Sequence, residues 1–421
     1  MRRNLLVFIA LTFGLIFPSA AWPQSATSAL ISKSPRVDVK ALMNKANSGN
    51  PEAQFELGVA YEHGLGADKS EYDAMRWYRM AANSGHTEAQ NSLAYLYEIG
   101  SESLRDIAEA VKWYRRGAIY GNSMSQYNLG RLYLYGRGVP QSNDEALYWL
   151  RKSADSNCPL ALAALGLMYA TGHLVPIDTN QALKLTKKAV KQHSAEGEAV
   201  LGILYVDGFG VSKNLAEGTK WLGKAAENGS AAGQYALGLL HAAGKGVERN
   251  PEEAVRLFRL AAEQGALKAQ HALGQIYEFG QGVPADRKEA VAWYRRAADQ
   301  GDPESATRLG SIFLLGQGVD KNVNEAVKLL TLGAEKENPY AQFNLAGLYA
   351  SGTGVQRDLQ KALSLFTLAG KTLDVSKQLN DITSQLNPEG SGAKTAPEAA
   401  SVSSASNARL PSATYSDRSP Q

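Results

Sequence analysis

The sequence predicts an all-α solenoid of about nine helix-turn-helix repeats, each 36 residues long. Three features recur at this period: a leucine, a glycine seven residues later and a polar residue thirteen residues later. The leucines are Leu57, Leu93, Leu129, Leu165, Leu201, Leu237, Leu273, Leu309 and Leu345. Equal spacing without an insertion indicates stacked supersecondary units. Positions within a repeat are numbered here from this leucine, which is position 0.

Each repeat contains a stop signal and a start signal for helices. Glycine occupies position +7 in every repeat. Glycine readily adopts the left-handed backbone conformation that ends a helix. Position +13 is always Ser, Asp or Asn, whose side-chain oxygen accepts hydrogen bonds from the first N–H groups of a helix. Each repeat should therefore hold an A helix, a loop and a B helix. The first two A helices are predicted over 51–63 and 87–99, and the first two B helices over 71–84 and 107–120.

Apolar residues in both helices recur at the spacing that stacking requires. In the first A helix, Ala53, Leu57, Gly58 and Tyr61 lie on one face. The B helices carry a small residue, mostly alanine, at +17 and large apolar residues around +20 and +21, with Trp149 in the third repeat. One helix pair cannot bury all of these side chains, whereas a stack of pairs can.

The two ends of the chain differ from the repeats. Arg2 and Arg3 precede an apolar run and then small residues, a pattern typical of a secretory signal peptide. The apolar run is too short for a bilayer core of about 30 Å, and the alternative is an uncleaved N-terminal anchor. The C-terminal stretch is rich in Pro, Gly, Ser, Ala and Thr, which predicts disorder. The predicted organisation is a signal peptide over 1–21, a linker over 22–36, the repeat solenoid over 37–373, a C-terminal capping helix over 374–386 and a disordered tail over 387–421. We expect a periplasmic or secreted protein with no membrane span after cleavage.

The composition argues against several classes of function. The net charge is only +3 and the charged residues are scattered, which disfavours nucleic acid as a partner. The single cysteine, Cys158, excludes an internal disulfide framework and is interpreted as a packing residue. The six histidines are spread over the repeats, and no phosphate-binding, zinc-hydrolase or serine-hydrolase motif is supported by its context. We therefore expect no metal, no cofactor and no catalytic residues.

The repeat pattern resembles a known family. The run A-Q-H-A-L-G-Q-I-Y-E-F-G-Q-G-V at 269–283, followed by a capped helix with A-x-x-W-Y, is similar to the Sel-one-like repeat of the tetratricopeptide-like superfamily. The resemblance implies a right-handed α/α superhelix whose A helices line the concave side. Glu102 replaces the second loop glycine in repeat two, as Leu174 does in repeat four, where His193 also replaces a turn glycine. Irregular loop geometry is expected there.

The candidate binding site lies on the concave face that the resemblance implies. Positions −2, +2, +5 and +6 lie off the Leu/Tyr packing face and carry aromatic and aliphatic residues with a few charges, as protein grooves do. The candidate partner-binding residues are Tyr127, Arg131, Tyr135, Leu167, Ile203, Asp207, Tyr235, Leu239, His271 and Phe279. The alternative is that a tight superhelix buries them between repeats. Position −2 accepts Asn91 and Thr307 elsewhere, which favours an accessible surface.

The first hypothesis for function is an exported, non-catalytic scaffold or adaptor that binds a protein or peptide partner. Envelope regulation and exopolysaccharide assembly are roles of related exported repeat proteins, and the residues do not choose between them. A β-lactamase-like enzyme is an alternative that the family suggests, but this chain lacks the paired cysteines of that branch. Peptidoglycan or carbohydrate binding is another, because exposed aromatic rings can stack on sugars.

Export is testable directly. We predict cleavage near Ala21 in the expressing cell, because the charged, apolar and small-residue regions follow one another in the order that signal peptidase requires. Intact-mass analysis of the purified protein should show the shortened chain. A dominant species that retains Met1 would contradict export by cleavage.

Overall fold

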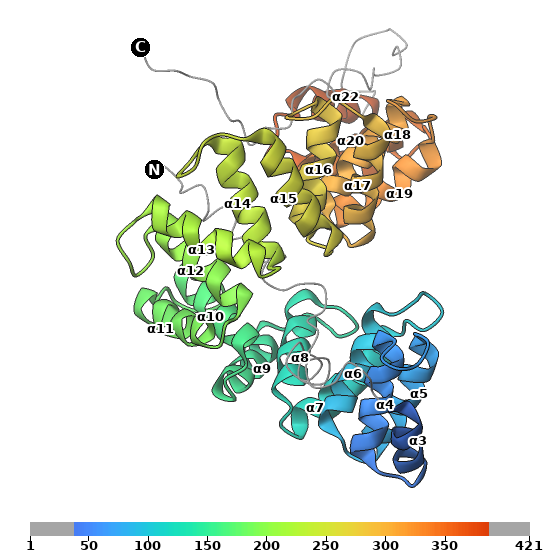
Figure 1. Ribbon diagram of the computed structural model, residues 1–421. Coiled ribbons are helices and arrows are strands. Elements are labelled where there is room, and N and C mark those ends of the chain that lie inside the picture. The colour runs from blue at the N-terminus through green and yellow to red at the C-terminus, as the bar shows by residue number, and fades with distance from the viewer. Residues whose placement is uncertain (1–37, 387–421) are drawn as a thin grey trace. The chain divides into compact units, whose positions relative to one another are not determined.

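The computed structural model describes residues 38–386, which hold twenty helices and no strand (Figure 1). The predicted signal peptide, the linker and the C-terminal tail lie outside these residues. The predicted all-α class is confirmed. Within 38–386, no helix combines the length and the apolar character that crossing a bilayer requires.

Every repeat contributes one A helix and one B helix, within about a residue of the predicted ranges. The A helices are α4 (Pro51–His63), α6 (Thr87–Ile99), α8 (Ser123–Tyr135), α10 (Pro159–Thr171), α12 (Ala195–Asp207), α14 (Ala231–Ala243), α16 (Leu267–Phe279), α18 (Pro303–Leu315) and α20 (Pro339–Ser351). The B helices are α5 (Glu71–Asn83), α7 (Ile107–Ile119), α9 (Asn143–Asp155), α11 (Thr179–Lys191), α13 (Leu215–Glu227), α15 (Pro251–Glu263), α17 (Arg287–Asp299), α19 (Val323–Glu335) and α21 (Leu359–Ala369). The flanking helices are α3 (Val39–Asn47) and α22 (Ser376–Leu386), the latter two residues shorter than predicted.

Local signals fix where these helices begin and end. All nine residues at +13 cap their B helix through a side-chain oxygen, as when Ser70 accepts from the backbone N–H of Asp73. The glycines at +7 have positive φ except Gly100, whose φ is −57°. Repeat two therefore has the irregular loop that was expected. In repeat four, Leu174 and His193 keep positive φ, so the expectation of irregular geometry is wrong there.

The core of each repeat forms where the A helix meets its own B helix. The position 0 leucines are all buried, and so are the alanines at +17. Position +1 is glycine in seven repeats and alanine in repeats two and nine, which lets the helices approach closely: a Cβ on Gly58 would lie 2.5 Å from the ring of Tyr78, and one on Gly202 would lie 2.7 Å from Leu222. These separations are shorter than van der Waals contact, so the +1 glycines set the distance between the two helices.

A recurring hydrogen bond joins most of the repeats to the one before. In six repeats, a glutamine at −3 donates its side-chain amide to the backbone carbonyl of an alanine near the end of the preceding B helix, at 3.0–3.4 Å. The donors are Gln54, Gln90, Gln126, Gln234, Gln270 and Gln342. Each of these carbonyls lies in the last turn of its helix and also accepts from the backbone N–H three residues later. The glutamine thus adds a second hydrogen bond to the carbonyl and links the neighbouring repeats.

The chain divides within α14 into two compact units, one up to Leu237 and one from Gly238 onward. In the first unit, consecutive helices from α3 to α13 pack against one another in chain order. In the second unit, helices α15 to α22 do the same. Each unit therefore builds its core from contacts between neighbours in the sequence.

The third repeat offers a test of this packing. Trp149 is 8% exposed and donates its indole N–H to Glu145 at 3.0 Å. We predict that Trp149→Ala lowers the free energy of unfolding by about 3–5 kcal/mol, as for other large aromatic core truncations. Tyr148→Ala is the matched control, since the neighbouring Tyr148 is 50% exposed. Denaturant melts that place the two variants within about 1 kcal/mol of each other would show that Trp149 is not core.

Candidate functional site

The structure corrects the prediction for position −2. Tyr127 is fully buried, and Asn91 and Thr307 at the same position are at most 3% exposed. The reason is that position −2 faces the next repeat: the Asn91 amide oxygen accepts from the Asn128 side chain at 3.2 Å. A polar residue is tolerated here because it finds partners between repeats, not because it meets solvent. Tyr127 is therefore not an accessible anchor, and Tyr127→Ala is expected to affect stability first.

Position +2 is likewise covered in the middle of the array. Arg131, Leu167 and Ile203 are each at most 2% exposed, so their predicted role as surface contacts is wrong. In repeats four and five, the A helices α10 and α12 pack directly against each other, which leaves little room for a groove between them. Arg131 is instead the partner of a buried glutamate described below. Asp207, at +6, is also buried.

The remaining candidates keep some exposure but do not form one surface. Tyr135 and Tyr235 are half-buried and belong to the first unit. Leu239 and His271, also half-buried, and Phe279, which is 57% exposed, belong to the second. The ten predicted residues are thus divided between two compact units. Their role in binding stays a prediction for the accessible members only.

The second unit has an accessible surface on its A helices around Phe279. The guanidinium of Arg308 lies over the Phe279 ring, 5.5 Å from its centroid. Leu315, at the same repeat position as Phe279, is 37% exposed. Arg308, Ser311 and Leu315 lie three and four residues apart along α18 and so share a face, and Asn344 of α20 donates to Ser311 at 3.2 Å. We call Phe279, Arg308, Ser311, Leu315 and Asn344 the Phe279 surface.

Three buried glutamates form a feature that the sequence interpretation missed. Each stands at +5 of an A helix and accepts a hydrogen bond from a tyrosine at +21 of its own B helix. The pairs are Glu62–Tyr78 at 2.6 Å, Glu98–Tyr114 at 3.2 Å and Glu278–Tyr294 at 2.9 Å. The sequence carries a signal for them: the three repeats with glutamate at +5 are the three with tyrosine at +21. The two positions therefore change together within this chain.

An arginine from the following repeat neutralises two of these glutamates. Arg131 donates to both oxygens of Glu98, at 2.7 and 2.5 Å, in a fully buried ion pair. Arg308 donates through Nε to both oxygens of Glu278, at 3.0 and 2.9 Å. A buried carboxylate needs such a partner, because an uncompensated charge in the interior costs several kcal/mol. Each pair also ties two neighbouring A helices together.

Glu62 differs from the other two because no arginine reaches it. Among the ion pairs of the described residues, none includes Glu62. Burial is the largest cause that raises the pKa of Glu62, to about 7, against the lowering effects of the Tyr78 hydrogen bond and of Lys69. This carboxyl group therefore changes charge near neutral pH.

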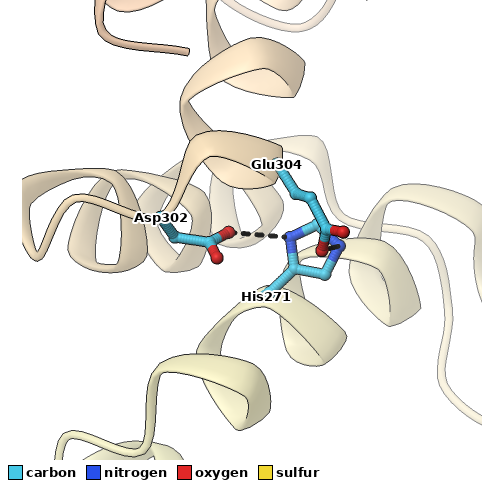
Figure 2. Close-up of side chains that lie close together, drawn as sticks. All are labelled: His271, Asp302 and Glu304. Carbon is cyan, nitrogen blue, oxygen red and sulfur yellow. Dashed lines mark ion pairs between the residues drawn. The ribbon is translucent and has the colours of Figure 1, made fainter. Parts of the chain in front are cut away.

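His271, Asp302 and Glu304 bring together residue types that bind metals (Figure 2). The His271 ring lies between the two carboxylates: Nδ1 is 3.5 Å from Asp302, and Nε2 is 3.9 Å from Glu304. The Lys268 ammonium already lies 3.2 Å from Glu304 and 3.7 Å from Asp302, and Nδ1 is 2.8 Å from the Ser305 hydroxyl. A metal ion would have to displace the ammonium group. The cluster is better described as a set of ion pairs and hydrogen bonds that joins α16 to the start of α18.

The side chain of Cys158 also has a structural role and not a chemical one. Cys158 is 3% exposed, and burial raises the pKa of its thiol. A protonated, covered thiol is a poor nucleophile. This agrees with its interpretation as a packing residue.

The geometry of the repeats agrees with a family comparison. The model of the Sel1 repeat matches nine consecutive segments of this chain: 51–86, 87–119, 123–158, 159–194, 195–230, 231–265, 267–302, 303–338 and 339–371. The chain belongs to the Sel1 repeat family. Sel1 repeat proteins are typically protein-interaction scaffolds and are generally non-catalytic. The resemblance drawn from the sequence pattern is confirmed.

Solved structures with Sel1 repeats are similar to this chain. A protective antigen present in uropathogenic Escherichia coli strains, which displays an SLR fold, is 31% identical over 83% of each chain, with a TM-score of 0.42. A Sel1 repeat protein from Oxalobacter formigenes is 30% identical over 74% of this chain and 91% of its own, with a TM-score of 0.48. A comparison with curated proteins returned no match.

The unpaired carboxyl group of Glu62 generates a pH-dependent prediction. Because its pKa is raised to about 7 in the folded state, folding favours the protonated form, and this contribution to stability is lost as pH rises through 7. We predict that Glu62→Gln stabilises the protein relative to wild type by about 2–3 kcal/mol more at pH 8 than at pH 5. Urea unfolding at both pH values measures this. An equal difference at the two pH values would show that Glu62 titrates normally.

Proposed function

We propose that this Sel1 repeat protein is an exported, non-catalytic scaffold that binds a protein or peptide partner through the Phe279 surface. The observation that carries the proposal is the exposure of Phe279, a large aromatic side chain, on an A helix. The fold does not require an aromatic there, because other repeats have His63 and Ser351 at position +6. Arg308 holds the ring from one side, so little conformational entropy would be lost on binding.

The composition of the Phe279 surface supports a protein partner. Aromatic and arginine side chains are enriched among the residues that dominate binding energy at protein interfaces. Leu315 adds apolar area, and Ser311 and Asn344 supply hydrogen-bonding groups at the edge. This is the arrangement of an apolar centre with a polar rim. The A helices are the concave side in the superhelix that the family implies, which suits an extended segment of the partner.

Two parts of the proposal rest on the sequence. Export depends on the signal-like N-terminal segment, which points to the periplasm or the cell exterior as the place of action. Absence of catalysis is supported by the covered thiol of Cys158 and by the lack of a sequence motif for a nucleophile. A nitrocefin assay of the purified chain tests the β-lactamase-like alternative, and we expect no hydrolysis above background.

The binding surface is tested by truncating its centre. A partner captured from an envelope extract on the tagged chain would first be identified and purified. We predict that Phe279→Ala weakens its binding by about 2 kcal/mol or more, as for an interface anchor, with an unchanged helical signal and melt. Leu368→Ala is the matched control, because Leu368 is a 40% exposed apolar residue on a B helix of the same unit. Equal affinity of the wild-type protein and the folded Phe279→Ala variant would place the binding site elsewhere.

A further inference from the structure

The three buried glutamates provide an internal comparison. Glu98 and Glu278 each receive an arginine from the next repeat, at position +2 and position −1 respectively. At Glu62 the same two positions hold Tyr95 and Ser92, which are neutral. Repeat one therefore has a tyrosine-bound carboxyl group without the cation that completes the other two sites.

The surroundings of Glu62 do not replace the missing charge. Tyr78 from α5 donates a hydrogen bond to one carboxylate oxygen of Glu62. Tyr95 from α6 also lies close to Glu62: burial and the nearby negative charge of Glu62 raise the pKa of Tyr95 to about 12. The charge of Lys69 lowers the pKa of Glu62 and that of Glu71 raises it, and among the described residues Lys69 forms no ion pair with Glu62. The adjacent His63 is exposed at the end of α4, and burial is the main cause that lowers its pKa.

The position of this group suits a ligand. Glu62 retains 8% exposure, and no arginine of the next repeat covers its carboxylate as Arg131 covers that of Glu98. Tyr95 stands at the repeat position that Arg131 fills in repeat three, and it is half-buried. A cation that enters beside Tyr95 would meet a carboxylate on one side and an aromatic ring on the other. Guanidinium groups bind both kinds of surface, because they are planar and donate in a fork.

We propose that Glu62, Tyr78 and Tyr95 form a socket for an arginine side chain of a bound polypeptide, which takes the place that Arg131 and Arg308 fill beside the other two glutamates. The partner is then one that presents a basic residue to the first unit. This rests on the proposed function only in that the ligand is a polypeptide. The socket and the Phe279 surface lie in different units, so each can fail without the other.

The test uses the full chain with ¹³C-carboxyl-labelled glutamate, with the Glu62 resonance assigned by its loss in Glu62→Gln. The probe is N-acetyl-arginine methylamide, and the neutral control is N-acetyl-citrulline methylamide. A bound cation stabilises the carboxylate, so the arginine probe should lower the pKa of Glu62 by about half a pH unit or more at saturation, and citrulline should not. By linkage the affinity for the probe should also rise with pH, by about threefold from the protonated to the ionised form for a half-unit shift and by more for a larger one.

Two variants complete the experiment. Glu62→Gln should abolish binding of the probe while it keeps an acceptor for Tyr78, and circular dichroism checks its fold. Arg308→Ala removes the cation from Glu278 and should create a second socket, visible as a second responsive carboxyl resonance. An unchanged Glu62 pKa in the presence of the arginine probe overturns the proposal, most clearly if Glu278 responds in Arg308→Ala. An equal response to arginine and citrulline also overturns it, because the site would then not recognise charge.

Discussion

The close approach of the two helices within each repeat is the constraint on which the rest of the structure depends. It is made possible by a residue without a large side chain at +1, opposite the large residue at +21. At Gly58 and Gly274, a Cβ would lie 2.5 Å from the ring of the facing tyrosine. This approach carries the tyrosine hydroxyl to the +5 position of the same A helix. A packing requirement therefore also decides where a buried carboxyl group can be stabilised.

The three glutamate sites differ in whether the next repeat provides an arginine that neutralises the carboxylate. Glu98 and Arg131 form a fully buried pair, whose removal from water is offset by two short hydrogen bonds and by the Tyr114 hydroxyl. Glu62 has only a tyrosine, and the cost of burial appears instead as a raised pKa. The same local motif can thus be structural in one repeat and available for a ligand in another.

The sequence alone predicted the helices and their caps because the signals for them are local. A side-chain oxygen at +13 and a glycine at +7 act within one turn of the helix end, whatever the neighbouring repeats contain. The burial of position −2 was not predictable in this way, because the residues that contact Asn91 there lie more than thirty positions further along the chain. Asn91 at the same position looked like a surface residue, since its partners Ser125 and Asn128 belong to the next repeat. The glutamate–tyrosine pairs were visible as a covariation between +5 and +21, but the lack of an arginine beside Glu62 was not.

The glutamine that bonds to the preceding B helix is absent from repeats four, five and eight, where Leu162, Glu198 and Ala306 stand instead. At these joints the carbonyl at the end of the preceding helix lacks the amide donor that the other repeats provide. Each repeat is stabilised mainly by contacts with its neighbours. The strength of each contact between repeats therefore determines whether the two repeats unfold together. Amide hydrogen exchange should therefore be fastest in the helix ends that flank these three joints. The solenoid would open there into segments, while the glutamine-linked blocks remain closed.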